Sequence, residues 1–279
     1  MRIALDVMGS DHGPQELIPG ALKWVLEQKG QVFLVGSSPI IQAELDKYEY
    51  DPSKVNIVEA SQVIEMDESP ALALRRKRDA SIVVATKLVK DNIADAVVSC
   101  GSTGAQMAAA IFILGRLEGI ERPPIVTSIP INDDKYSLLI DVGANTDCKP
   151  TQLLQFAILG NVYSKMILGI HNPRIALLNN GTEETKGNNV TVESYNLLRE
   201  QKDLNFIGNI EGRDIFKDKS DVIVCDGFVG NILLKTIEGM AEYLAVNIKK
   251  ETGSLPNFFK KLDYTQIGGA PLLGIDGIS

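Results

Sequence analysis

Four short polar loops contain the residues whose types and spacing suit phosphate chemistry. Each loop follows an apolar, β-branched run and precedes a helix-like segment, in the stretches VVSCGSTGAQMAAA (97–110), LLIDVGANTDCKP (138–150), ALLNNGTEETKGNN (176–189) and VIVCDGFVGNILLKT (222–236). In an open α/β sheet, loops at the carboxyl ends of neighbouring strands converge on one crevice. Backbone N–H groups and helix N-termini in such loops bind anions. The pattern therefore predicts an enzyme that handles a phosphate-like group.

The first loop, GSTG at 101–104, suits close approach to an anion. Gly101 and Gly104 permit a tight turn, and Ser102 and Thr103 can donate hydrogen bonds at the start of the helix. The loop matches neither a Walker loop nor the GxGxxG pattern. A plain capped strand–helix turn is the alternative interpretation.

The second loop brings Asp141, Asn145, Asp147 and Lys149 together. Such crowding is costly unless the groups pair or bind something. The two aspartates could hold a divalent cation, but hard cations usually collect more oxygen ligands. We therefore expect no metal, and we expect Asp141 and Asp147 to orient Lys149 and backbone amides.

Lys186, in the third loop, is the principal catalytic candidate. It lies between Thr185 and Gly187 after an Asn-Gly turn, where its ammonium group can approach a phosphate oxygen or a developing oxyanion. A solvated loop lysine is the alternative. The other substrate-binding candidates of the third and fourth loops are Asn180, Gly181, Gly187, Asn188, Asp226, Gly227 and Asn231.

Two further groups stand outside these loops. Asp11 and His12 follow the first predicted strand, and His12 suits a general acid, an anion donor or a helix cap. Arg75, Arg76, Lys77 and Arg78 form a basic cluster in an acidic chain. Most charge runs are solvated faces, but this contrast also predicts a site for an acidic macromolecular partner.

Composition narrows the class of protein. The 279 residues are 44% hydrophobic and carry a formal charge of -8, which predicts a large core and disfavours a general nucleic-acid binder. No apolar run is long enough to span a membrane, and the N-terminus does not read as a signal peptide. Three cysteines, Cys100, Cys148 and Cys225, lack metal-ligand spacing and are expected to be core or loop thiols. These features favour a cytoplasmic enzyme.

Alternating strand and helix patterns predict an α/β fold with a mostly parallel sheet. We expect strands at 2–8, 31–36 and 55–60, and helices at 15–28, from 39 to about 45, and over 70–91. No linker divides the sequence, so we expect residues 1–279 to form one α/β domain or two interleaved halves. We expect residues 238–262 to form a helical segment at the surface. This segment either packs on the domain or contacts a partner chain or a membrane.

Six ordered segments of the sequence resemble the PlsX family of bacterial phosphate acyltransferases. They are LDVMGSDHGP, SCGSTGA, DVGANTDCKP, LLNNGTEETKGN, CDGFVGNILLKTIEG and LDYTQIGGAPLLG. The resemblance implies a three-layer α/β/α sandwich similar to phosphotransacetylases and isopropylmalate dehydrogenases. It also implies a homodimer without a cofactor that transfers a fatty acyl group from acyl-carrier protein to orthophosphate. The family further implies peripheral association with the inner face of the cell membrane and delivery of acyl phosphate to a glycerol-phosphate acyltransferase.

This reaction fits the candidate residues. Hydrogen phosphate is already an anionic nucleophile and a thiolate leaves readily, so positioning and oxyanion stabilisation are the main needs. We assign these to Lys186 and the Ser102–Thr103 loop, and we expect the substrate pocket to be completed by Asn145, Lys149, Asn188 and Asn231. His12 is a secondary candidate for protonating the sulfur, and residues 75–78 are expected to bind the carrier protein.

The sequence departs from the family pattern at several positions. Residues 9–14 read GSDHGP where the family usually has GGDHAP, Ser102 replaces a common Asn, and Asn180 replaces an apolar residue. In the family, a strand with an HGS motif and a closing helix follow GGAPLLG; this sequence ends at Ser279 without them.

Two other functions stay open from the sequence. The first is an enzyme of the same fold with another reaction, either a phosphotransacetylase using acyl-coenzyme A or a metal- and NAD-dependent dehydrogenase. The second is a non-catalytic scaffold that binds acyl ligands or membranes.

Overall fold

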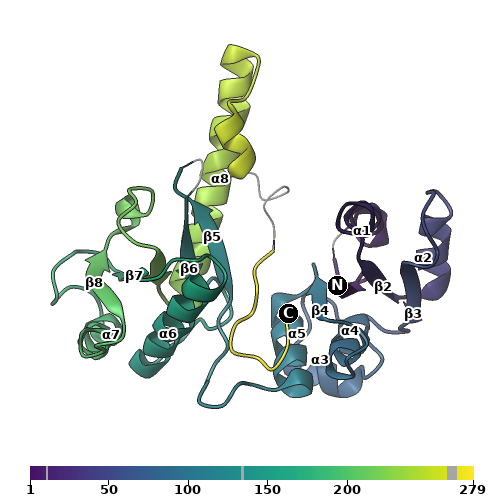
Figure 1. The fold of residues 1–279 in the computed structure, drawn as a ribbon, viewed down its shortest axis with the longest axis horizontal. Helices are drawn as coiled ribbons and strands as arrows, with labels where there is room; N and C mark the ends of the chain where they lie inside the picture. The colour runs from purple at the N-terminus through teal and green to yellow at the C-terminus, as the bar shows by residue number, and fades with distance from the viewer. Residues whose placement is uncertain (11, 133–134, 263–268) are drawn as a thin grey trace. The chain divides into compact units, whose positions relative to one another are not determined.

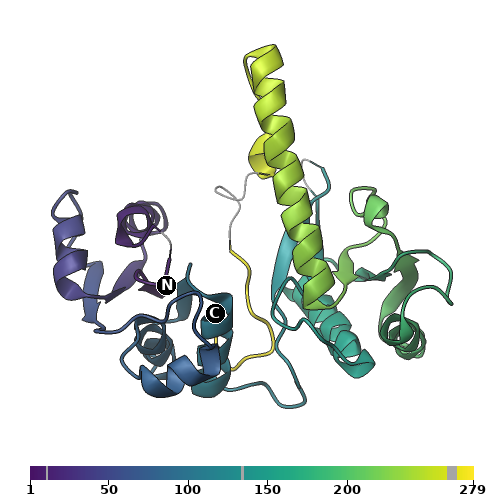
Figure 2. The same ribbon diagram turned by 180° about the vertical axis from the view of Figure 1, so that it is seen from behind.

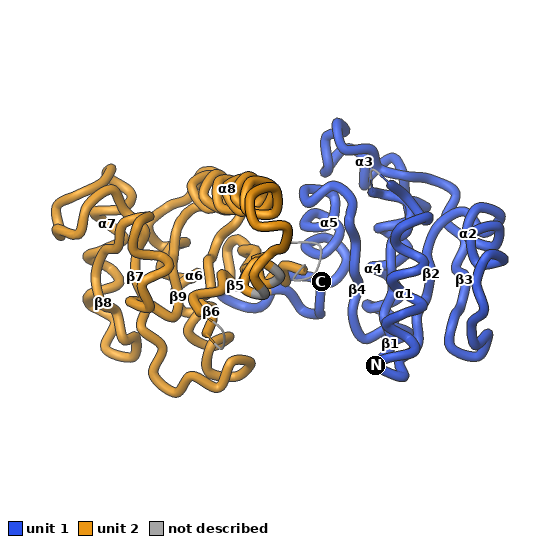
Figure 3. The backbone as a smooth tube through the Cα atoms, turned by 90° about the horizontal axis from the view of Figure 1, so that it is seen from above, with its two compact units in different colours: residues 1–119, 275–279 blue, residues 120–274 orange. Residues whose placement is uncertain are grey.

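The chain divides into two compact units. A computed structural model describes residues 1–10, 12–132, 135–262 and 269–279. Unit 1 comprises residues 1–119 and 275–279, and unit 2 comprises residues 120–274 (Figure 3). The last residues return to unit 1, where the Val97 N–H donates to the Ile278 carbonyl (3.0 Å). The chain therefore contributes to unit 1 from both of its ends.

Unit 1 is built on a four-stranded parallel sheet with the order β3-β2-β1-β4 (Figure 1). Its strands are β1 (Arg2–Asp6), β2 (Gln31–Gly36), β3 (Val55–Glu59) and β4 (Ala96–Ser99). Its helices are α1 (Pro14–Gln28), α2 (Ser38–Leu45), α3 (Pro70–Arg76), α4 (Ser81–Lys90) and α5 (Thr103–Ala109), which continues into the π-helical turn η1 (Ala110–Leu114).

Apolar side chains cover both faces of this sheet. Leu5 and Leu34 are paired in register and pack in one cluster with Ile18 of α1 and Ile41 of α2. Side chains alternate between the faces of a strand, so the buried Ala4 lies on the opposite face, and α4 also contacts β1, β2 and β4. Burial on both faces is typical of parallel sheets.

Unit 2 is built on a five-stranded sheet with the order β5-β6-β9-β7-β8, in which only β5 is antiparallel to its neighbour. Its strands are β5 (Val126–Pro130), β6 (Tyr136–Ile140), β7 (Arg174–Leu178), β8 (Asn205–Ile210) and β9 (Val222–Val224). Its helices are α6 (Pro150–Met166), α7 (Asn189–Arg199) and α8 (Gly227–Thr252), with short 3-10 turns η2 (Gly212–Asp214) and η3 (Asn257–Lys261). The predicted α/β class with mostly parallel strands is confirmed.

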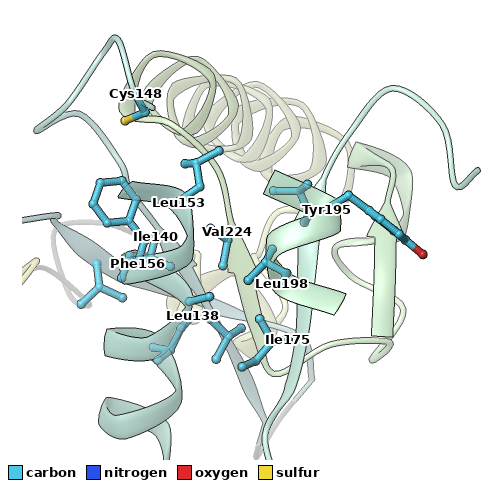
Figure 4. Close-up of a cluster of buried hydrophobic side chains, with 13 residues drawn as sticks. Leu138, Ile140, Cys148, Leu153, Phe156, Ile175, Tyr195, Leu198 and Val224 are labelled. Atoms are coloured by element: carbon cyan, nitrogen blue, oxygen red, sulfur yellow. The ribbon is translucent and has the colours of Figure 1, made fainter. Parts of the chain in front are cut away.

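One apolar cluster anchors α6 and α7 to this sheet (Figure 4). Phe156 of α6 and Leu198 of α7 are fully buried against Ile140 and Val224 of the central strands. Gly160 lets α6 approach β9 closely, because a Cβ atom there would lie 2.6 Å from Cγ1 of Val222. This packing holds both helices against the sheet.

The segment 70–91 forms two helices, so the prediction of one continuous helix is wrong. The first helix ends at Arg76, and Lys77 leaves helical geometry (φ -105°, ψ 70°). The Lys77 ammonium group donates to the Val63 carbonyl (2.6 Å) and to Glu68 (2.5 Å). These tertiary bonds, with the bridge between Gln62 and Ala80, override a helical pattern that looks continuous in sequence.

The distal half of α8 extends beyond the sheet of unit 2 (Figures 1 and 2). The buried residues of the helix are Gly227 and Gly230, both in its first turns. Farther along, Tyr243 and Val246 are 64% and 62% exposed. Residues 238–262 thus comprise exposed helix followed by η3, up to the described limit at residue 262.

Candidate active site

In unit 1, the loops after β1 and β4 meet where the strand order reverses. These strands are neighbours, and the chain moves outward from them in opposite directions, which is where α/β sheets bind ligands. Asp6 is 2% exposed and accepts hydrogen bonds from the Ser99 hydroxyl (2.9 Å) and the Met8 N–H (3.2 Å). A Cβ atom on Gly101 would lie 2.9 Å from the Gly9 carbonyl oxygen. Only glycine allows these two loops to touch.

The candidates Ser102, Thr103 and Gly104 differ in their roles. Ser102 caps α5, and its hydroxyl accepts from the Ala105 N–H (3.4 Å). Thr103 is exposed at the first position of the helix. Gly104 lies against α3, since a Cβ atom there would be 2.7 Å from Cγ of Pro70. Thr103 and the Ser102 hydroxyl are therefore the groups of this loop that a ligand can reach.

His12 lines a different hollow from Ser102. The histidine borders a hollow of about 470 Å³ with Pro39 of the α2 N-terminus and with Glu44 and Lys47. Ser102 lines a smaller crevice with Asp6 and Ser99. Asp11 lies outside the described residues.

In unit 2, Asp141 organises the loop after β6. The carboxylate is fully buried and accepts backbone hydrogen bonds from Ile125 (3.0 Å), Gly143 (3.2 Å), Ala144 (3.1 Å) and Asn145 (2.7 Å). A fifth bond comes from the Asn145 side-chain amide (2.9 Å). Burial raises the pKa of Asp141, and these donors oppose that shift. Its carboxylate thus holds the backbone of the loop in place.

The remaining polar residues of this loop divide between buried and exposed positions. Asn145 is 4% exposed, and its amide also donates to the Pro123 carbonyl (3.0 Å). Asp147 and Lys149 are exposed, and Lys149 immediately precedes α6. Among the described residues, no carboxylate forms an ion pair with Lys149, so Asp141 orients amides rather than this lysine.

Two glycines let α8 begin directly over the β6 loop. The Gly227 N–H donates to the Asn145 carbonyl (2.7 Å), and a Cβ atom on Gly227 would lie 2.9 Å from Asn145 backbone atoms. At Gly230, a Cβ atom would lie 1.8 Å from the Asp141 carbonyl oxygen. Asp226 caps the helix by accepting from the Val229 N–H (2.8 Å). Asn231 follows these glycines on an exposed turn.

The loop after β7 carries Lys186 and is held by Asn179. The Asn179 amide donates to the Lys186 carbonyl (2.9 Å), and its Oδ1 accepts from the Asn180 N–H (2.8 Å). Gly181 makes room for the lysine, because a Cβ atom there would lie 2.8 Å from Cγ of Lys186. Within the described part of the chain, no carboxylate pairs with the Lys186 ammonium group. The loop therefore presents an exposed, uncompensated cation.

The end of this loop leads into α7. Gly187 has φ +102°, and a Cβ atom there would lie 2.0 Å from Oγ1 of Thr191. Asn188 caps α7 by accepting from the Thr191 N–H (2.9 Å). Asn180, Gly187 and Asn188 line a cavity of about 590 Å³ together with Val229 of α8. The structure thus joins candidates from the third loop to the start of the helix that follows the fourth.

Three helix N-termini share the carboxyl edge of the unit 2 sheet. Helices α6, α7 and α8 follow β6, β7 and β9, which lie side by side. Helix N-termini carry partial positive charge and attract anions. With Lys186 and Lys149 exposed at the same edge, the arrangement suits a phosphate group and a developing oxyanion.

Cys148 and Cys225 are buried thiols. Burial raises the pKa of Cys148 to about 12 and raises that of Cys225 well above its usual value. Both thiols therefore stay protonated near neutral pH. Over the described ranges, no group of three or more His, Cys, Asp or Glu side chains could hold a metal ion.

The basic cluster at 75–78 lies at the end of α3 in unit 1. Arg75, Arg76 and Arg78 are exposed, whereas Lys77 is engaged with Glu68. Leu72 is 53% exposed, and it shares a helix face with Arg75 and Arg76, which follow it by three and four residues. The three arginines thus form an exposed basic surface at the end of α3, and Leu72 adds an exposed apolar side chain on the same helix.

Sequence reasoning missed two organising residues, Asp6 and Asn179. Asp6 ends the first strand, and Asn179 is the first residue of the Asn-Asn pair after β7. Asp6 is a single carboxylate within the apolar run 3–8, and Asn179 is the first polar residue after the apolar run 175–178; these are the signals that could have found them. No described helix is both long and apolar enough to cross a membrane.

Comparison with known proteins gives consistent matches. A family model described as "Fatty acid synthesis protein" matches residues 1–279. The chain is 64% identical over its whole length to a phosphate acyltransferase from Syntrophomonas wolfei, of which it covers 88%. It is 52% identical to a phosphate acyltransferase from Heliobacterium modesticaldum, with 100% of this chain and 87% of that protein covered.

Solved structures show the same fold at low identity. A phosphotransacetylase from Streptococcus pyogenes aligns with a TM-score of 0.63 and 19% identity, covering 100% of this chain and 86% of that one. A 4-hydroxythreonine-4-phosphate dehydrogenase from Klebsiella pneumoniae aligns with a TM-score of 0.59 and 14% identity, covering 99% and 89%. At these identities, the likeness concerns the fold alone.

Proposed function

The chain belongs to the fatty acid synthesis protein family and is a phosphate acyltransferase, and we propose that it transfers a fatty acyl group from acyl-carrier protein to orthophosphate. The products are an acyl phosphate, used in phospholipid synthesis, and free carrier protein. One observation supports this most strongly. The N-termini of α6, α7 and α8 share an edge of the unit 2 sheet with the exposed, uncompensated ammonium group of Lys186.

In the proposed reaction, an oxygen of hydrogen phosphate attacks the thioester carbonyl carbon. The tetrahedral oxyanion then expels the carrier-protein thiolate, so a C–O bond forms and the C–S bond breaks. Free thiols have a pKa of about 8.5, so the thiolate is a good leaving group and takes up a proton after release. The reaction needs no resident cofactor.

The proposed roles follow the position of each residue. Lys186 neutralises phosphate and oxyanion charge, with Lys149 and the helix N-termini adding positive potential. Asn180, Asn188 and Asn231 donate to substrate oxygens, and Gly181, Gly187 and Gly227 allow close backbone approach. Asp141, Asn145, Asp147 and Asp226 act through the loops that they hold or border. In unit 1, Ser102, Thr103 and Gly104 form a second anion-binding turn, and His12 is a secondary candidate for protonating the sulfur, with Asp11 beside it in sequence.

The test is a trapping assay with purified protein. We expect phosphate-dependent release of carrier-protein thiol from hexadecanoyl carrier protein, with hydroxylamine capturing the acyl phosphate as a hydroxamate. Thiol release without phosphate would indicate a thioesterase and contradict the proposal. Equal or faster turnover with hexadecanoyl-coenzyme A would assign the donor to coenzyme A, as in a phosphotransacetylase. Acyl-ligand binding without turnover would favour the non-catalytic scaffold.

We propose that the carrier protein docks on the basic surface of α3. Arg75, Arg76 and Arg78 would meet the acidic face of the partner, and Leu72 would supply the apolar contact. Lys77 supports the surface through its bond to Glu68. A variant with Arg75→Glu and Arg78→Glu should raise the KM for the carrier-protein substrate at least tenfold. The control Lys29→Glu with Lys54→Glu makes the same charge change at two exposed positions, after α1 and before β3, and should leave it unchanged.

The family resemblance also leads us to propose a homodimer and peripheral contact with the inner face of the cell membrane. Exposed apolar side chains support this on α8 and η3, at Met240, Tyr243, Leu244, Val246 and Phe258. Acyl phosphate would pass there to a glycerol-phosphate acyltransferase. Sedimentation velocity tests the dimer, and flotation with anionic phospholipid vesicles tests the membrane contact.

A further inference from the structure

The cavity beside the Lys186 loop has two chemically different sides. On one side, Asn180, Asn188 and Thr191 offer polar groups from the β7 loop and the first turn of α7. On the other side, Val229, Ile232 and Leu233 of α8 offer an apolar wall. The volume of about 590 Å³ lies within the range of roughly 300–1,000 Å³ that small-molecule sites occupy.

The apolar wall runs along one face of α8. Val229, Ile232, Leu233 and Thr236 have the i, i+3, i+4, i+7 spacing of a single helix face. Seven residues span about 10 Å along a helix axis, so the wall is elongated. The Thr236 hydroxyl donates to the Ile232 carbonyl (2.7 Å), so this donor is already used within the helix.

The uncharged lining of the cavity favours some kinds of ligand over others. None of the described residues that line this cavity has an ionisable side chain. A coenzyme A nucleotide, with its phosphates, would need cationic partners, whereas an alkyl chain needs only apolar contact and exclusion of water. The lining therefore fits an uncharged hydrocarbon chain attached to a polar head.

We propose that this cavity holds the acyl chain of the substrate along α8, with the thioester end at Asn180 and Asn188 and the chain running past Ile232. The inference rests on the proposed acyl transfer and adds the location of the chain. In this arrangement, the carbonyl lies at the loop that carries Lys186, and the methyl end lies toward Thr236.

The test compares donors of two lengths. Ile232→Trp fills the cavity from a side chain that is 53% exposed, so the fold should tolerate it; circular dichroism checks this. Because one methylene in an apolar pocket changes kcat/KM by roughly 10-fold or more, the hexadecanoyl-to-butanoyl ratio should fall at least tenfold. Thr236→Trp should give the same direction of change. The control Leu26→Trp, on an exposed position of α1, should keep the wild-type ratio.

The outcomes separate the two proposals. An unchanged ratio in both cavity variants, with wild-type turnover intact, would overturn the acyl site and leave the acyltransferase standing. Absence of phosphate-dependent turnover with either donor would overturn the proposed function instead. In that case, fluorescence of cis-parinaric acid tests the cavity alone. Binding by wild type that Ile232→Trp abolishes would support the site, and equal binding or no binding by wild type would refute it.

Discussion

Gly230→Ala tests whether α8 must begin in contact with the β6 loop. A Cβ atom at this position would lie 1.8 Å from the Asp141 carbonyl oxygen and 3.0 Å from Sγ of Cys225. Ordinary contact begins at 3.4 Å, so helix and loop must separate by about 1.6 Å. That movement weakens the hydrogen bond that joins α8 to the loop, from the Gly227 N–H to the Asn145 carbonyl (2.7 Å).

The expected cost follows from these two effects. Overpacking a core site typically costs about 1–3 kcal/mol, and one lost hydrogen bond adds about 1 kcal/mol. We therefore expect the free energy of unfolding to fall by about 2–4 kcal/mol. Unit 2 should melt roughly 4–16 °C lower, because 1 kcal/mol shifts Tm by about 2–4 °C for a domain of this size.

A matched substitution in the same helix provides the control. A Cβ atom on Gly239 meets no atom within 4 Å, so Gly239→Ala should gain about 0.5–1 kcal/mol from helix propensity alone. Thermal melts followed by circular dichroism compare the two variants. A Gly230→Ala protein as stable as Gly239→Ala would refute the close approach of α8 to the loop.

Three further predictions address Asp141, Cys148 and Asp218. Asp141→Ala leaves five N–H donors without their acceptor and should cost about 3–5 kcal/mol; urea unfolding measures this, and a loss below 1 kcal/mol would contradict it. With its pKa raised to about 12, Cys148 should resist iodoacetamide at pH 8 in the native protein and react after unfolding, which mass spectrometry of digests detects. Hydrogen bonds from Lys135 and Arg174 lower the pKa of Asp218 below 3.8. The Asp218 carboxylate therefore contributes its full stabilisation of the fold above about pH 4, and this contribution is lost as the pH falls through its lowered pKa. In Arg174→Leu, the free energy of unfolding should therefore decline less steeply as the pH falls.

The sequence predicted the alternating elements because their local signals agree with their tertiary environment. The strand at 31–36 carries the apolar run VFLV and lies inside the sheet of unit 1, where burial on both faces keeps such a run apolar. The helix break at Lys77 depends on partners at Val63 and Glu68. No periodicity within 70–91 reports those contacts.

The sequence predicted which loops contain the candidate residues, but not which of these loops and side chains contact one another. Strand order decides which loops are neighbours, and it places those after β6, β7 and β9 on one sheet and GSTG on the other. The types of residue at 141 and 145 suggested ligand binding, yet both side chains bond to each other and to the backbone of residues 123–125. The sequence does not distinguish a buried aspartate, such as Asp141, from an exposed one, such as Asp147. Only the structure separates them.

The central claim is that this enzyme makes acyl phosphate with Lys186 at its catalytic site. The most direct measurement is the rate of phosphate-dependent hydroxamate formation from hexadecanoyl carrier protein by wild type, Lys186→Ala and Lys202→Ala. Lys202 is an exposed lysine in the turn after α7 and serves as the control. We predict robust formation by wild type and Lys202→Ala, and a loss of about 10²–10³ in kcat for Lys186→Ala, as for removal of an oxyanion-stabilising group. A folded Lys186→Ala protein with the wild-type rate, or a wild type that forms no hydroxamate, would contradict the account.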